Sequence, residues 1–224
     1  MWCIGKITEE YRERMYELLA LYARPYTARE PVVCVDEKSK QLLRQTRAAL
    51  ASRPGQIAKA DYEYQRAGTR NIFLAVEPKG CHREVNVTTR RAKPDFVEFV
   101  QRLVTEVYGH ARRIHIVLDN LNTHFRTSFE EVLGIRASRH LLRRVRFHYT
   151  PKHASWLNMA EIEIGILSRQ CLGKRRIPDL NTLRRETRAW NRRMNRTHVK
   201  INWRFTRKAA RRKFGYKRKS FTRS

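Results

Sequence analysis

Residues 114–124 read IHIVLDNLNTH, a short apolar run that ends abruptly in polar side chains. Ile114 to Leu118 is rich in β-branched residues and has no helical period, which predicts a buried strand ending at Asp119. A similar run, PVVCVD at residues 31–36, predicts a second buried strand that ends at Asp36. Sites in α/β sheets usually form at the C-terminal ends of strands, so we expect these two aspartates to share one.

A third carboxylate lies on a predicted helix over residues 155–171, within the stretch HASWLNMAEIEI. At about 100° per residue, Glu161 and Glu163 flank the apolar stripe of this helix on opposite sides, roughly 80° from its centre. They cannot serve the same site, and helix geometry alone allows either. The stripe comprises Leu157, Ala160, Ile164, Leu167 and Cys171.

Each carboxylate also has an ordinary interpretation. Asp36 is followed by Glu37, and either acid could be a loop charge. Asp119 with Asn120 is also typical of an Asx-turn or a helix cap. A glutamate on a helix usually belongs to a solvated face, so Glu161 alone indicates little.

Three carboxylates converging in a strongly basic chain predict a site for two hard metal ions that cuts or joins a phosphodiester backbone. The 224 residues include 49 Lys and Arg against 21 Asp and Glu, a net charge of +28. Such an excess favours a polyanionic partner, although charge alone defines no reaction. The excess is concentrated in residues 173–224, which hold 20 Lys and Arg and only two acids.

The four cysteines are dispersed, without a C-x-x-C pair, which argues against a zinc knuckle and favours small apolar core residues. No signal peptide and no membrane-length apolar run is found, so we expect an intracellular, reducing compartment and no membrane partner.

Hydrophobic periodicity predicts a mixed α/β sheet with helices packed on its faces. Residues 39–70 are polar and basic, and we expect little structure there. The tail 204–224 is expected to be disordered in isolation. Strands are expected at 31–36, 71–78, 83–89, 114–119 and 145–151, and helices at 7–23, 94–108, 123–133, 155–171 and 179–195.

Four blocks, in order, resemble the DDE transposases of bacterial insertion sequences related to the mariner elements, the insertion sequence 630-like group. They are YARPY…PVVCVDEKSKQLL, DYEYQRAGTRNIF, IVLDNLNTH and HYTPKHASWLNMAEIEIGILSRQCL. The resemblance runs from about residue 20 to residue 195. It implies a ribonuclease-H-like fold and two Mg²⁺ ions, replaceable by Mn²⁺, held by Asp36, Asp119 and Glu161. Glu161 is preferred to Glu163 because the family's last acid follows a Leu-Asn-x-x pattern, here beginning at Leu157.

The resemblance also implies partners and a location. Double-stranded DNA would be bound as element terminal inverted repeats and as target, by a homodimer in a bacterial cytoplasm, associated with the nucleoid. Family members carry an N-terminal helix-turn-helix region, and the 35 residues before Asp36 are too few for it and a linker. We therefore expect residues 1–30 to be a helix and connector, 31–196 the DDE catalytic domain, and 197–224 a basic tail.

Several side chains are candidates for contact with DNA. His148, Lys152 and His153 surround the turn before Glu161, where they either contact phosphate or stabilise the turn. His124 contacts substrate or caps its helix, and Trp156 belongs to the core or stacks on an unpaired base. A basic arm interleaved with the aromatic residues Trp203, Phe205, Phe214, Tyr216 and Phe221 is typical of nucleic-acid binding. The basic candidates are Arg188, Arg192, Arg211, Arg212 and Lys213.

The sequence therefore predicts a metal-dependent transposase core that cleaves element ends and transfers the 3′-hydroxyl strand. Two alternatives stay open: an inactive or regulatory DNA-binding fragment, and a ribonuclease-H-like nuclease that does not transpose.

Overall fold

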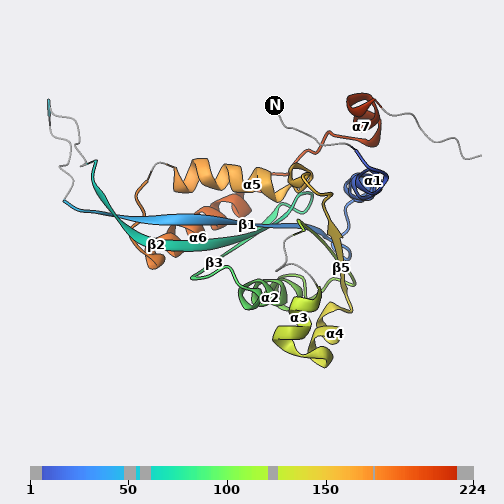
Figure 1. The fold of residues 1–224 in the computed structure, drawn as a ribbon, viewed down its shortest axis with the longest axis horizontal. Helices are drawn as coiled ribbons and strands as arrows, with labels where there is room; N and C mark the ends of the chain where they lie inside the picture. The colour runs from blue at the N-terminus through green and yellow to red at the C-terminus, as the bar shows by residue number, and fades with distance from the viewer. Residues whose placement is uncertain (1–6, 48–53, 56–61, 121–125, 174, 216–224) are drawn as a thin grey trace, which may run out of the picture.

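A five-stranded mixed sheet forms the centre of the computed structural model, with helices on both faces (Figure 1). The structure describes residues 7–47, 54–55, 62–120, 126–173 and 175–215. The strand order is β3-β2-β1-β4-β5. The first three strands are antiparallel, whereas β4 pairs parallel with both β1 and β5. The strands are β1 Val32–Gln45, β2 Tyr64–Glu77, β3 His82–Thr88, β4 Ile114–Leu118 and β5 Val145–Tyr149.

Three of the helices, α1, α6 and α7, begin at residues whose side chains cap them. Thr8 accepts a hydrogen bond from the backbone of Tyr11 at the start of α1, and Asp179 does the same for Thr182 at the start of α6. Helix α7 begins after Thr206 and ends at Gly215, which adopts the left-handed conformation. The helices are α1 Glu9–Ala23, α2 Lys93–Arg102, α3 Arg126–Leu133, α4 Ile135–Leu142, α5 Ala160–Leu167, α6 Leu180–Thr197 and α7 Arg207–Phe214.

Alternation along the strands divides the core into two layers. Val33, Val35 and their neighbours face α2, α3 and α4, whereas Cys34 faces α1, α5 and α6. Figure 1 shows α2–α4 on one side of the sheet and α5 with α1 and α7 on the other. Cys34, Cys81 and Cys171 are buried and free of disulfides, as expected for core residues.

The largest departure from expectation is the length of the first hairpin. Residues 39–45 and 64–70 were expected to have little structure, yet they extend β1 and β2 into a paired ribbon, with Lys40 opposite Arg70. Its side chains are mostly polar and exposed, so the ribbon carries no apolar alternation from which a strand could be predicted. In Figure 1 the ribbon projects beyond the helices that cover the rest of the sheet.

The C-terminal tail also departs from expectation. Residues 207–214 form α7, although this tail was expected to be disordered. Its aromatic residues pack on the fold: Trp203 lies edge-on to Tyr22, with ring centroids 5.5 Å apart, and Phe205 lies edge-on to Trp156 at 5.2 Å. These rings therefore pack on the fold, whereas DNA binding by the basic side chains of this arm stays a prediction. Tyr216 and Phe221 lie outside the described residues.

Smaller differences affect the helices. Helix α4 was not predicted, because the expected helix 123–133 was thought to lead directly into the strand at 145. The last turns of two helices, residues 103–107 after α2 and 168–172 after α5, are π-helical. None of the helices within the described ranges combines the length and apolar character that crossing a bilayer requires.

Candidate active site

Asp36 lies in β1, and Asp119 directly follows β4, the parallel strand beside it. The register of β1 with β4 pairs Val32 with His115 and Cys34 with Val117. Continued by two residues, it sets Asp119 opposite Asp36. Asp36 lies two residues after Cys34, and Asp119 two residues after Val117. Side chains alternate along a strand, so both aspartates face the same side as Cys34 and Val117, which belong to the core layer beneath α5. The two carboxylates therefore share one face of the sheet.

The sequence prediction for Asp36 was partly wrong. Asp36 was expected at the end of its strand, but β1 continues to Gln45. The strands that end at this edge of the site are instead β4, which stops at Leu118, and β5 beyond it, which stops at Tyr149. Beyond that point one edge of β1 has no strand beside it among the described residues, and Asp36 lies at this edge. Asp36 is 8% exposed and accepts a 2.7 Å hydrogen bond from the backbone N–H of Glu37.

Glu161 lies in the first turn of α5, on the same face. The start of this helix is held against β1 by the buried Asn158, whose side chain donates to the carbonyl of Val35 at 2.8 Å. The same side chain accepts from the backbone N–H of Ala160, and the carbonyl of Asn158 accepts from Glu161. Asn158 thus connects the residue before Asp36 to the turn carrying Glu161, whose side chain is exposed.

Glu163 has a different environment. It is 1% exposed and forms a 2.8 Å ion pair with Arg83 of β3, which is equally buried. Asn195 of α6 fixes the backbone of Arg83 through two hydrogen bonds. Glu163 is therefore a structural partner of Arg83, and Glu161 is the acid on this helix that faces solvent. Helix geometry alone had left these two open.

Glu37, the acid beside Asp36, is also engaged elsewhere. It points to the opposite face of β1, where Arg91 approaches one of its oxygens at 3.1 Å. Of the two adjacent acids, Asp36 alone shares a face with Asp119.

Divalent metal ions suit this donor set. Three carboxylates and an open sheet edge match the oxygen ligands and retained waters that Mg²⁺ prefers. No three His, Cys, Asp or Glu side chains within the described ranges are gathered closely enough to hold a single ion. A two-ion site does not need such a cluster, since one carboxylate bridges the ions and the others hold one each.

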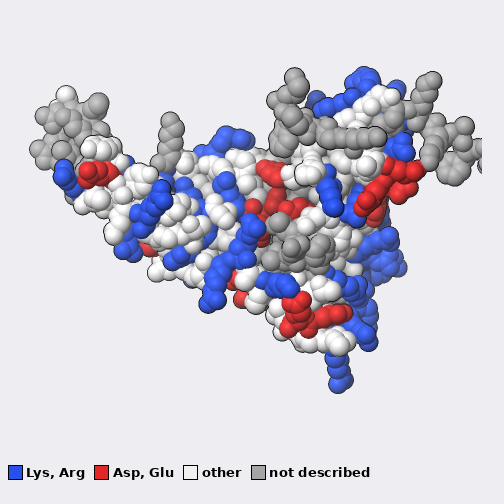
Figure 2. All heavy atoms as spheres, in the orientation of Figure 1, with Lys and Arg blue, Asp and Glu red and all other residues white. Residues whose placement is uncertain are grey.

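Figure 2 shows the charge distribution on one face of the molecule. Asp and Glu atoms gather near the middle of the face, close to the start of α5, with Lys and Arg atoms around them, and further groups lie over α1 and over α3 and α4. The central group is an acidic spot bordered by basic side chains. Such a spot attracts cations, and its surroundings attract a polyanion.

The turn before α5 exposes two of the predicted DNA-contacting residues. Lys152 and His153 are exposed, and His153 has a φ of 59° that makes the turn tight. His148 is different: it is buried and pairs with Glu17 and His115, so its predicted contact with phosphate is wrong. Trp156 is partly buried under Phe205. His124 lies outside the described residues.

The remaining basic candidates fall on two helices. Arg188 and Arg192 are exposed on α6 and border a small hollow of about 140 Å³ between this helix and β3. Arg212 and Lys213 are exposed on α7, where Arg211 is partly buried. The structure does not bring these two groups into one cluster, because α6 and α7 lie in different parts of the molecule (Figure 1).

Sequence reasoning missed a chain of polar contacts beneath α1. Arg24 meets His115 at 3.0 Å, His115 meets His148 at 2.9 Å, and His148 meets Glu17 at 2.7 Å. Arg24 can only donate, so the protons of both rings point along the chain toward Glu17. Burial lowers the pKa of His115 to about 4 and also lowers that of His148. The only available signal was a histidine inside each of two apolar strands.

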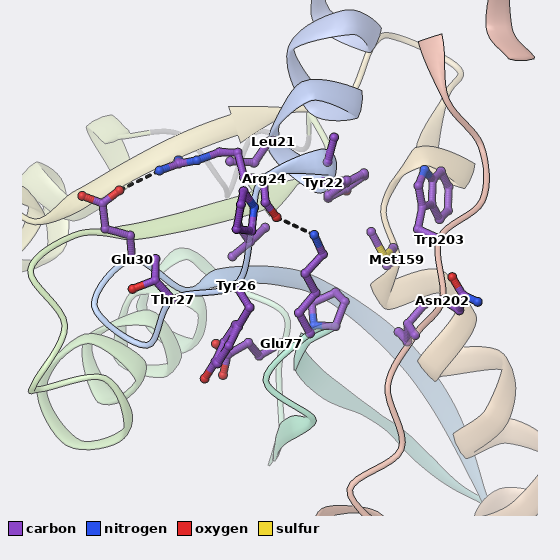
Figure 3. A pocket seen from close by; sticks show the side chains of 16 residues that line it. Leu21, Tyr22, Arg24, Tyr26, Thr27, Glu30, Glu77, Met159, Asn202 and Trp203 are labelled. Carbon is purple, nitrogen blue, oxygen red and sulfur yellow. Dashed lines mark hydrogen bonds and ion pairs between the residues drawn. The ribbon is translucent and has the colours of Figure 1, made fainter. Parts of the chain in front are cut away.

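A separate cavity of about 320 Å³ lies between α1, the β2–β3 turn and residues 201–203 (Figure 3). Tyr22, Met159 and Trp203 line it on one side. On the other side Arg24 forms a 2.7 Å ion pair with Glu30. None of the three candidate carboxylates lines this cavity, so it is not the active site.

Comparison with solved structures identifies the fold. The chain is similar to the Mos1 mariner paired-end complex with Mn, with a TM-score of 0.54 at 15% identity over 88% of this chain and 61% of that one. It matches the Mos1 strand transfer complex with a TM-score of 0.54 at 16% identity, over 85% and 56% of the two chains. It thus spans less than two thirds of those chains. The sheet and its helices are ribonuclease-H-like, as the sequence predicted.

Sequence comparison identifies the family. No curated protein matches the chain. The profile of the family described as DDE superfamily endonuclease matches residues 31–184, which include Asp36, Asp119 and Glu161. Because this match covers more than half of the sequence, the chain belongs to the DDE superfamily endonuclease family.

Proposed function

We propose that the protein is the catalytic core of a metal-dependent transposase that cleaves DNA at the ends of an insertion sequence and joins the freed 3′-hydroxyl to target DNA. The observation that best supports the proposal is the parallel register of β1 and β4, which pairs Cys34 with Val117 and, continued by two residues, would bring Asp36 opposite Asp119. The family match and the likeness to Mos1 complexes with DNA support it.

In this proposal Asp36, Asp119 and Glu161 would hold two Mg²⁺ ions, for which Mn²⁺ could substitute. When bound, the ions neutralise phosphate charge and activate the attacking oxygen. Asp36 and Asp119 are suited to a shared, bridging role because adjacent strands fix their separation. Glu161 approaches from the helix and would hold the second ion. The strand and the Asn158 anchor limit how far the three can move, which favours an ordered site.

We further propose that DNA lies across the basic surface around the site, with a homodimer engaging paired ends. Lys152 and His153 stand at the rim of the site, and Arg188, Arg192, Arg211, Arg212 and Lys213 would contact phosphates farther away. Such contacts supply affinity without sequence information. Residues 31–196 would form the catalytic unit, flanked by the N-terminal helix and the basic tail.

The first test is Mn²⁺-dependent nicking of supercoiled plasmid by the protein and by its Asp119→Asn variant. The variant removes one negative charge without changing side-chain volume, so we expect nicking to be lost and DNA binding to persist. Equal nicking by the two proteins would refute the assignment of Asp119. DNA binding without nicking by either would favour the inactive-fragment alternative.

A second substrate separates a transposase from a nuclease. An oligonucleotide duplex with a pre-cleaved element end offers a free 3′-hydroxyl, and only a transposase should join it to a target plasmid. Joined product that requires Mg²⁺ and Asp119 would support the proposal. Hydrolysis without joining would favour the nuclease.

A further inference from the structure

The polar contacts of α1 reach the backbone next to Asp119. Arg14, on the second turn of α1, donates from Nη1 to the side-chain oxygen of Asn120 at 3.1 Å. Its other nitrogen, Nη2, pairs with Glu10 of the same helix at 2.9 Å, which holds the guanidinium in place. We infer that Arg14 is a positioning residue for Asp119 and acts through Asn120, an inference that rests on the proposed role of Asp119 as a metal ligand.

Asn120 has a second attachment that makes this action effective. Its side-chain N–H₂ donates to the carbonyl of Thr150, just beyond the end of β5. The backbone N–H of Thr150 in turn donates to the carbonyl of Leu118 at 3.0 Å. Asp119 is thus bracketed by Leu118 and Asn120, both tied to Thr150. Arg14 holds the other polar end of the Asn120 side chain, its oxygen.

Helix α1 is itself held against the rest of the fold, so the backbone of Arg14 has a fixed position. The hydroxyl of Tyr22 donates to the carbonyl of Leu157 at 2.8 Å, and Glu17 accepts from the buried His148. Met15 and Leu18, on either side of these contacts, are almost fully buried in the layer beneath α5. The helix can therefore transmit its position to Asn120 rather than follow it.

Removal of the Arg14 contact should loosen Asp119 without unfolding the chain. Two carboxylates must stay within a narrow range of positions to share hard ions, because Mg²⁺ and Mn²⁺ demand near-ideal coordination geometry. The Arg14 side chain is 38% exposed, so its contact is screened and its effect is modest. We expect metal affinity to weaken about 3- to 10-fold.

The test is equilibrium binding of Mn²⁺ to the full chain without DNA, with free Mn²⁺ followed by electron paramagnetic resonance. The variants are Arg14→Ala, Arg14→Lys, Asn120→Ala and the Arg14→Ala/Asn120→Ala double variant. Arg12→Ala is the matched control, because it removes the same charge from the same helix and pairs instead with Glu9. Asp119→Asn tests the metal site itself, and thermal unfolding without metal checks that each variant is folded.

We expect Arg14→Ala to weaken Mn²⁺ binding, Arg14→Lys to restore part of it, and Arg12→Ala to leave it unchanged. The double variant should bind no more weakly than Asn120→Ala, since the two residues act in series. Arg14→Ala binding like Arg12→Ala, while Asp119→Asn abolishes binding, would overturn the positioning role alone. Binding that is unaffected by Asp119→Asn would overturn both this role and the proposed metal site.

Discussion

The polar side chains near the two ends of β4 have contrasting environments. At its C-terminal end Asp119 follows the last paired residue and stands beside Asp36, where the neighbouring strands stop. Near its N-terminal end His115 is 4% exposed and is hydrogen-bonded into a chain from Arg24 to Glu17. Only four positions along the chain therefore separate the candidate metal site from a buried polar network.

The difference shows how a buried polar group becomes structural or reactive. A side chain whose partners all belong to the protein fixes the fold, and ions or substrate cannot compete for it. A side chain at an edge left open by its neighbours keeps donor or acceptor capacity for something else. The same contrast recurs over two residues of α5, between Glu161 and Glu163.

The largest expected effect comes from a substitution at the candidate metal site, beyond the C-terminal end of β4. Glu161→Gln keeps the shape of the side chain but removes a charge that would hold an ion, so we expect metal-dependent nicking to fall about 10³-fold. Because Glu161 is exposed, thermal stability should be nearly unchanged. Initial rates of plasmid nicking and the melting temperature measure the two effects. A fully active variant would exclude Glu161 from the site.

Substitution of Glu163, the buried acid on the same helix, should lower stability and leave nicking intact. Glu163→Gln leaves the Arg83 guanidinium buried without its counter-ion, and the loss of one partner of a buried pair costs about 3 kcal/mol or more. We expect a lower midpoint in urea unfolding, with nicking retained per folded molecule. A stable but inactive Glu163→Gln variant would reverse our assignment of the two glutamates.

The stability contributed by His115, near the N-terminal end of β4, should depend on pH. His115 is neutral in the fold because burial lowers its pKa to about 4, whereas the unfolded residue titrates near 6.5. Its contribution is complete above pH 6.5 and is lost as pH falls toward 4. We expect about 2 kcal/mol less stability at pH 5 than at pH 7.5. His148, Arg24, Glu30 and Arg113 face the ring and belong to the same response.

Urea unfolding at several pH values checks this expectation. His115→Gln should flatten the dependence on pH, and His110→Gln, at an exposed position, is the matched control. An unchanged pH slope in His115→Gln would show that other groups set the acid sensitivity.

The smallest expected effect concerns the basic surface around the candidate metal site. Arg192→Ala removes one exposed charge from α6. If Arg192 contacts a phosphate, DNA binding should weaken a few-fold for every sequence, and the slope of log K against log salt should decrease in magnitude by about 1. Fluorescence anisotropy at several salt concentrations measures both. An unchanged slope would place the DNA elsewhere.

The sequence predicted the buried strands, and Asp36 and Asp119 as candidates, because their signals are local. An apolar run that ends in an aspartate, as at Asp119, is visible within ten residues. The choice between Glu161 and Glu163 could not be made from helix period, since Arg83 lies 80 residues away along the chain. The family pattern chose Glu161, and the burial of Glu163 with Arg83 agrees with that choice.

The long hairpin and the histidine chain could not be predicted for related reasons. The outer half of β1 and β2 is mostly polar apart from the buried Leu42, so pairing between the strands is its main signal. His148 had the features of an active-site residue in the sequence, but Glu17 and His115 enclose it in three dimensions. Contacts between distant segments decide both cases.

The packing of α7 on α1 has a consequence for the order of folding. Arg207 donates two hydrogen bonds to the carbonyl of Tyr16, and Trp203 packs on Tyr22. These two contacts of α1 are thus made almost two hundred residues after it during synthesis on the ribosome. The sheet, α5 and the buried face of α1 can assemble before them, and the contacts with Tyr16 and Tyr22 close only when residues 203–207 have left the exit tunnel.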